Sequence, residues 1–186
     1  MVSRVTKPWT VRQSRVLLDR KWLTLREDHV VLPSGHEIEE FHVVDTRNWV
    51  AVLALTEAGQ IVVVDQYRHG LGRVSRELPA GVIDRGETPR DAAERELLEE
   101  TGYAADEWQL LSDVSTEPSR HTTRAIFYFA GAARRVGAPE PEASEDIQVR
   151  LLSTRELLEE VDRGGIQHGV HIGAILLAAR RGLFSR

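Results

Sequence analysis

Residues 81–103 read GVIDRGETPRDAAERELLEETGY, and this stretch organises the interpretation of the whole chain. Thr88 is a preferred N-cap residue, Pro89 suits the first helical position, and Asp91 lies where the acid of a capping box belongs. Gly102 suits the left-handed residue that follows a helix. The stretch therefore predicts a helix between Thr88 and Gly102. Its expected buried face comprises Ala92, Ala93, Leu97 and Leu98.

Three carboxylates, Glu96, Glu99 and Glu100, are crowded near the end of this helix. Because a helix turns by roughly 100° per residue, all three project within a sector of about 100°. Like charges four residues apart destabilise a helix, and acids near its C-terminus oppose the helix dipole. Most charge runs are solvated surface, here supported by pairs such as Arg90 with Glu94. The alternative is a site for a hard divalent cation, Mg²⁺ or Mn²⁺, and the helix alone leaves both interpretations open.

Apolar segments rich in β-branched residues predict strands on both sides of the helix. The expected strands are residues 14–19, 22–32, 36–44, 49–55, 60–68, 108–114, 124–132 and 147–152. Pro33 and Gly35 predict a hairpin turn between the second and third of these. The near-continuous apolar runs at 49–55 and 60–68 indicate strands buried on both faces. Residues 71–81, with two glycines and a proline, are expected to begin as a loop.

Two further helices are predicted near the end of the chain. Ser153 and Glu156 have the spacing of a capping box, and residues 166–181 show a second helical pattern. Strands first, then a helix, more strands and final helices indicate an α/β sandwich with a mixed sheet. We expect a small antiparallel β element at residues 1–47 and the main domain at residues 48–186.

Composition excludes several classes of protein. The chain has 186 residues, 41% hydrophobic and 28% charged, which is ordinary for one globular domain with a small appendage. Its net charge of −5 disfavours a nucleic-acid partner, and the absence of cysteine excludes disulfides and thiolate metal sites. The first ten residues lack the apolar core of a signal peptide, and no apolar run approaches the roughly 20 residues that span a bilayer. A cytoplasmic protein without a membrane partner is expected.

The spacing around the acidic helix matches a known motif. Gly81, Glu87 and the run 95–102, with Arg-Glu-Leu-x-Glu-Glu-x-Gly, agree with the Nudix box at every fixed position. Tyr103 stands where an aliphatic residue is commoner. The chain thus resembles a Nudix hydrolase, a family that cleaves a nucleoside diphosphate linked to another moiety by attack of water on phosphorus.

The resemblance implies roles for the box residues. Glu96, Glu99 and Glu100 would bind the divalent metal, Mg²⁺ or Mn²⁺. Arg95 would orient these acids, and Glu87 would support Arg95 from the loop. The metal would offset the repulsion between carboxylates and a pyrophosphate, polarise its oxygens and acidify a water molecule.

QYR at 66–68 and ELPAG at 77–81 resemble the ADP-ribose pyrophosphatase branch of the family. In that branch the N-terminal element completes a homodimer, and the pyrophosphate bond of a nucleoside diphosphate sugar is cleaved to a nucleoside monophosphate and a sugar phosphate. By position, Arg68 would hold substrate phosphate, Glu77 would line the site, and the Ala80 carbonyl would bind metal.

Two further assignments follow from the resemblance. Trp22 and Phe41 occupy positions where relatives stack aromatic rings on adenine, and the alternative for both is packing within the small sheet. Glu145 is the best-aligned candidate for the catalytic base, with Glu142 and Asp146 beside it. The alternative for these acids is an exposed loop.

Residues 115–127 depart from the pattern of the branch. Pro118 is in place, but Ser119 replaces a glycine and no acid follows. GDP-mannose, other nucleotide sugars, dinucleotides and nucleoside triphosphates therefore remain alternative substrates. A non-catalytic nucleotide-sugar sensor is a third possibility, disfavoured by the intact box. His168 and His171 are interpreted as ordinary helix residues.

Overall fold

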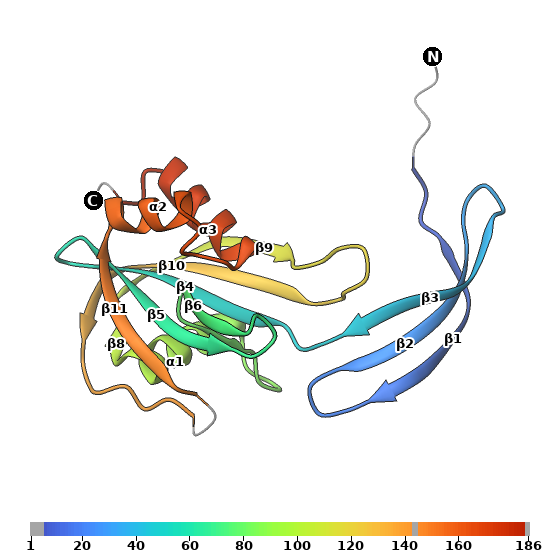
Figure 1. Cartoon of the computed structure of the whole chain (residues 1–186), viewed down its shortest axis with the longest axis horizontal. Coiled ribbons are helices and arrows are strands. Elements are labelled where there is room, and N and C mark those ends of the chain that lie inside the picture. The colour runs from blue at the N-terminus through green and yellow to red at the C-terminus, as the bar shows by residue number, and fades with distance from the viewer. Residues whose placement is uncertain (1–5, 143–144, 185–186) are drawn as a thin grey trace, which may run out of the picture. The chain divides into compact units, whose positions relative to one another are not determined.

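The computed structural model describes residues 6–142 and 145–184, which divide into two units. The first contains residues 6–47 and Ser115–Thr123, and the second contains residues 48–114 and 124–184. Figure 1 shows both units, with most of their elements labelled. The inclusion of a loop from the middle of the chain in the first unit is not predicted by the sequence.

The first unit is a three-stranded antiparallel sheet in the order β1-β2-β3. Its strands are β1 (Thr10–Asp19), β2 (Thr24–Val31) and β3 (Glu37–Asp45). Gly35, with a φ of +85°, donates its N–H to the Leu32 carbonyl at 2.9 Å, which confirms the expected turn between β2 and β3. The small antiparallel element is confirmed.

The loop Ser115–Thr123 is hydrogen-bonded to β3. Val44 donates its N–H to the Arg120 carbonyl at 2.9 Å and accepts from the Thr122 N–H at 3.2 Å. The hydroxyls of Thr46 and Thr123 also hydrogen-bond to each other. Backbone pairing across a long sequence separation therefore joins this loop to the N-terminal sheet.

The second unit is built on an eight-stranded mixed sheet. Its strands are β4 (Trp49–Thr56), β5 (Gln60–Arg68), β6 (Arg73–Glu77), β7 (Ala80–Val82), β8 (Tyr103–Ala104), β9 (Glu107–Ser115), β10 (Arg124–Arg135) and β11 (Ile147–Ser153). Their main order is β11-β5-β4-β10-β8. Strand β10 runs parallel to β4, whereas β5, β7 and β11 pair antiparallel to their neighbours.

Helices cover both faces of this sheet. They are α1 (Pro89–Thr101), α2 (Thr154–Asp162) and α3 (Gly169–Arg180). Side chains alternate along β4, so that Leu53 packs in the core with α2 and α3 while Val52 packs in the core with α1. The predicted α/β/α sandwich is thus confirmed, as is the capping box of Ser153 and Glu156. None of the helices within the described ranges is long and apolar enough to cross a membrane.

The two central strands β4 and β5 separate along their length, and this separation positions the site. They pair only at Ala54 with Val62 and Leu55 with Ile61. Beyond that point β6 pairs with β5, and β7 pairs with β4. The sequence predicts only that this segment begins as a loop, whereas the structure shows two short strands after the turn at residues 71–72. Two residues, Leu78 and Pro79, connect β6 to β7 where β4 and β5 diverge, and we call this connection the crossing.

Candidate active site

The ends of α1 lie where the sequence predicts them. Thr88 caps the helix by accepting the Asp91 N–H at 3.2 Å. Gly102 has a φ of +72° and donates its N–H to the Leu98 carbonyl at 2.7 Å. The expected buried face needs one correction, because Leu98 is exposed while Ala92, Ala93 and Leu97 are buried.

Two of the three clustered carboxylates take the place of apolar side chains on this buried face. Glu96 is 7% exposed and Glu100 is 1% exposed, whereas the Glu99 side chain is 44% exposed. The interpretation of the cluster as solvated surface is therefore wrong for Glu96 and Glu100. Burying a carboxylate is costly unless it has specific partners, so each must be accounted for.

Glu100 faces the crossing between β6 and β7. Its Oε2 accepts the Ala80 backbone N–H at 2.9 Å. Burial raises the pKa of Glu100 to about 9, and the negative charges of Glu96 and Glu145 act in the same direction. The Ala80 N–H opposes this rise without cancelling it. Glu100 is thus an acid whose ionised form is disfavoured by burial, and a cation bound beside it would stabilise that form.

Glu96 lies directly against Gly81 in β7. A Cβ atom placed on Gly81 would overlap the carboxylate of Glu96. This contact gives the glycine at the start of the motif a physical reason: only a residue without a side chain leaves room for the carboxylate. Burial raises the pKa of Glu96, and the charges of Glu145 and Glu99 add to the rise.

Arg95 ties the loop before α1 to the acids on the helix. Its Nε and one Nη donate to the two Glu87 oxygens, both at 2.9 Å, and it also donates to the Val82 carbonyl at 3.1 Å. The other Nη contacts Glu96 at 2.7 Å and Glu99 at 3.1 Å. The hydrogen bonds to Glu87 raise the pKa of Arg95 further above its usual range. This geometry suits the orienting role expected of Arg95 and the supporting role expected of Glu87.

We predict that Arg95→Lys lowers turnover by about tenfold to a hundredfold, because an ammonium cannot reproduce a planar fork that reaches five oxygen atoms of four residues. The measurement is kcat at saturating divalent metal, with Arg85→Lys in the exposed part of the same loop as the control. Equal activity of the two variants would contradict the orienting role of Arg95.

Arg68 and Glu77 form a pair beside this cluster, across β5 and β6. Arg68 donates to both Glu77 oxygens, with a shortest distance of 2.8 Å. Burial alone would raise the pKa of Glu77, but the hydrogen bonds and charge of Arg68 outweigh it and hold that pKa below its usual range. Arg68 remains partly exposed and also feels the charges of Glu100 and Glu145. Its guanidinium is therefore oriented by a buried acid and open to an anion.

Glu145 lies in the loop before β11, and its charge reaches the cluster. It contributes to the raised pKa of both Glu96 and Glu100. Its Oε2 accepts the Glu142 N–H at 3.1 Å, and its own N–H donates to the Glu142 carbonyl at 2.9 Å. Glu145 is thus held by two hydrogen bonds to the Glu142 backbone, one of them through its carboxylate.

The acids fit a divalent cation by their chemistry. They offer only oxygen donors, and burial, with smaller contributions from neighbouring carboxylates, raises the pKa values of Glu96 and Glu100. Within residues 6–142 and 145–184, no three acidic or histidine side chains are arranged as a metal cage. The reason is visible in the contacts: Glu96 and Glu99 turn toward Arg95, and Glu100 turns toward Ala80.

Trp22 and Phe41 lie in the first unit and differ in exposure. Trp22 is 60% exposed, with the Lys21 Nζ 4.3 Å from its ring centroid. Phe41 is partly buried between Trp9, edge-on at 5.6 Å, and the Arg120 guanidinium at 5.4 Å. Trp22 is therefore largely exposed with two cationic side chains over its ring, whereas Phe41 is packed within its own unit. Their roles toward a nucleobase stay predictions.

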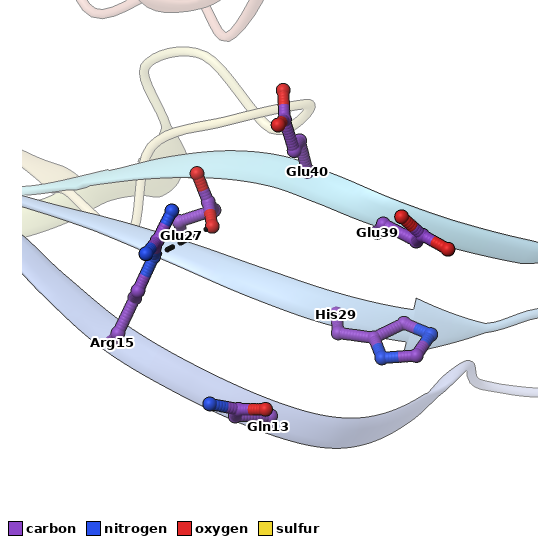
Figure 2. Close-up of a pocket in the computed structure, with 6 residues that line it drawn as sticks. All are labelled: Gln13, Arg15, Glu27, His29, Glu39 and Glu40. Atoms are coloured by element: carbon purple, nitrogen blue, oxygen red, sulfur yellow. Dashed lines mark hydrogen bonds and ion pairs between the residues drawn. The ribbon is translucent and has the colours of Figure 1, made fainter.

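A polar hollow of about 330 Å³ lies on the N-terminal sheet (Figure 2). It is lined by Gln13, Arg15, Glu27, His29, Glu39 and Glu40. Arg15 pairs with Glu27 at 2.8 Å, and His29 pairs with Glu37 at 2.7 Å. No residue predicted for the site lines this hollow, and its Arg15 and His29 side chains already have acidic partners.

His171 lies within α3 as expected, and the structure adds that it is a core residue with a specific backbone partner. Its ring is fully buried, stacked on His168 with centroids 4.3 Å apart, and its Nδ1 accepts the Leu78 N–H at 3.2 Å. The spacing of the two histidines on a predicted helix is the only trace of this arrangement in the sequence. It could not reveal the Leu78 partner.

Known proteins share both units. The Nudix domain model matches residues 45–169, and the model of a nucleoside diphosphate sugar hydrolase N-terminal domain matches residues 9–44. Among the relatives is an ADP-ribose pyrophosphatase of Mycobacterium tuberculosis, 38% identical over 82% of this chain and 74% of that protein. An ADP-ribose pyrophosphatase of Bacillus subtilis is 40% identical over 76% and 77%.

A solved structure described as an ADP compounds hydrolase has the same fold. Its TM-score is 0.80 at 18% identity, with 96% of each chain covered. The domain match spans more than half of the 186 residues, and it includes the loop and helix that carry the buried acids. The chain therefore belongs to the Nudix family and is a hydrolase similar to the ADP-ribose pyrophosphatases.

Proposed function

We propose that this protein hydrolyses the pyrophosphate bond of ADP-ribose or a related nucleoside diphosphate sugar, giving a nucleoside monophosphate and a sugar phosphate. The observation that carries the proposal is the buried pair Glu96 and Glu100, packed against Gly81 and Ala80. The names of the two pyrophosphatase relatives and the match to a nucleoside diphosphate sugar hydrolase N-terminal domain support the substrate class.

The proposed cofactor is Mg²⁺, with Mn²⁺ as the alternative, held by Glu96, Glu99, Glu100 and the Ala80 carbonyl. When bound, a divalent cation supplies charge that polarises phosphoryl oxygens and lowers the pKa of a water molecule. Arg68 binds a substrate phosphate through a guanidinium that Glu77 orients from behind. Arg95, anchored on Glu87, orients Glu96 and Glu99.

Glu145 is the proposed general base. We predict that Glu145→Gln lowers kcat by about a hundredfold or more, because a positioned base contributes roughly 10²- to 10⁴-fold to such reactions. Glu142→Gln, the same charge change three residues earlier in the chain, serves as the control and should retain activity. A loss confined to the Glu142 variant would assign the base to Glu142 instead.

We propose that the N-terminal element, residues 1–47, binds substrate and forms a homodimer. Trp22 is suited to stack on a nucleobase, because its ring is exposed and flanked by Lys21 and Arg47.

The proposed dimer involves strand β1, which exposes apolar side chains, among them Val16 and Leu17. Light scattering should give a mass twice that of the 20.9 kDa chain. The Val16→Glu variant should give the mass of a single chain, because the added charge would disrupt an apolar interface. A monomeric wild type at micromolar concentration would contradict the dimer.

The test of function is a substrate panel. Purified protein with Mg²⁺ is incubated with ADP-ribose, GDP-mannose, other nucleotide sugars, NADH and nucleoside triphosphates, and the products are identified. A nucleoside monophosphate and a sugar phosphate are expected. Preference for triphosphates or dinucleotides would reject the sugar-nucleotide assignment, and no turnover of any compound would favour a sensor.

A further inference from the structure

His171 is the point at which α3 contacts the crossing between β6 and β7. Its fully buried ring lies among Trp49 and Phe127, with centroids 5.6 and 5.5 Å away, and stacks on His168. Its Nδ1 accepts the Leu78 N–H at 3.2 Å. An imidazole nitrogen that accepts a hydrogen bond carries no proton, so the proton of the neutral ring is on Nε2. Burial lowers the pKa of His171 to about 3, and the ring is therefore neutral at physiological pH.

The crossing and Ala80, the first residue of β7, are held by three hydrogen bonds from three different elements. His171 of α3 takes the Leu78 N–H, Val52 of β4 donates to the Pro79 carbonyl at 2.9 Å, and Glu100 of α1 takes the Ala80 N–H. Pro79 has no N–H to donate, so the backbone donors of this segment are the N–H groups of Leu78 and Ala80. One of the two is satisfied by a proposed metal ligand and the other by His171.

We propose that His171 is a positioning residue for the hydrolase site. By accepting the Leu78 N–H, it fixes the segment in which Glu77 orients Arg68 and in which Ala80 and Gly81 face the acids of α1. The effect on catalysis rests on the proposed function, but the effect on geometry does not. A displacement on the order of 1 Å at a reacting site can cost a hundredfold in rate.

The alternative is that His171 only fills space in the core, and two substitutions separate these roles. His171→Leu keeps most of the volume but removes the acceptor, leaving the Leu78 N–H unsatisfied. His171→Asn loses more volume but keeps an acceptor, Oδ1, near the place of Nδ1. Positioning makes the Leu variant the worse of the two, and packing makes the Asn variant the worse. Ile175→Val, fully buried on the same helix, controls for loss of core volume.

The first readout is NMR of the free protein, which needs neither substrate nor metal. In uniformly ¹⁵N-labelled wild type, a scalar coupling across the N–H···N bond should connect the Leu78 nitrogen to Nδ1 of His171. The Ala80 and Gly81 amide signals should shift in His171→Leu and stay close to wild type in His171→Asn and Ile175→Val. Absence of the coupling, or unchanged Ala80 and Gly81 signals in the Leu variant, would overturn the proposal.

The second readout is Mn²⁺ affinity by electron paramagnetic resonance, together with kcat and KM. His171→Leu should weaken Mn²⁺ binding and lower kcat by about tenfold or more, while His171→Asn stays within about threefold of wild type. An Asn variant that is as impaired as the Leu variant would overturn the positioning role. If wild type hydrolyses no substrate, the proposed function fails, and the NMR result still decides this inference.

Discussion

Glu100→Gln should lower turnover by about a thousandfold and at the same time stabilise the metal-free protein. The loss follows from removing one charge from the proposed metal site, since several kcal/mol of transition-state stabilisation corresponds to about three decades in rate. Glutamine keeps the size of the side chain and an oxygen that can accept the Ala80 N–H. The fold is therefore expected to persist. Measured kcat at saturating Mg²⁺ tests the first part.

The gain in stability has a defined pH dependence. The pKa of Glu100 is about 9 in the folded protein and near the ordinary carboxyl value of about 4.3 in the unfolded chain. Between these values the folded protein binds more protons than the unfolded chain, so the wild type loses stability as pH rises. Glutamine does not titrate, and its advantage should grow from pH 5 to pH 8.

Thermal unfolding with a chelator, at both pH values, measures this difference. Glu94→Gln, an exposed acid on the same helix, is the control and should change neither stability nor turnover appreciably. A Glu100→Gln protein with normal turnover would remove this residue from the site. One less stable than wild type at pH 8 would contradict the raised pKa.

Gly81→Ala should reduce turnover by about a hundredfold with only a small change in stability. The added methyl group would occupy the space of the Glu96 carboxylate. Because that carboxylate is the end of a flexible side chain, it can move aside without disturbing the fold. The displaced carboxylate then no longer has the position that turnover requires. Metal affinity should fall in parallel with turnover.

Gly173→Ala is the matched control for this substitution. Gly173 is exposed on α3, and a Cβ there meets no atom within 4 Å. Alanine also has the higher helix propensity, so this variant should be at least as stable as wild type and fully active. Equal turnover of both alanine variants would show that Glu96 does not need its observed position.

The sequence predicts best what neighbouring residues determine. The ends of α1 depend on Thr88 and Gly102, and both cap as their residue types predict. The misassigned face of α1 has a different cause. Leu98 is apolar and exposed, while Glu100 is charged and buried, because tertiary contacts with β7 override the ordinary preference of each side chain.

The rest depends on contacts between distant segments. Strands β6 and β7 pair with β5 and β4 where those two strands diverge, and no local pattern predicts a gap between strands. The bond from Leu78 to His171 joins residues 93 positions apart. The box motif could predict which acids gather, but not that Gly81 makes room for Glu96.

The backbone pairing between Val44 and the loop Ser115–Thr123 has a practical consequence for protein engineering. A loop transplanted alone from another Nudix enzyme would lack the strand to which its backbone is hydrogen-bonded. A chimera should exchange the loop and β3 together, so that the backbone donors and acceptors keep their native hydrogen-bond partners. Directed-evolution libraries would likewise profit from varying both segments together.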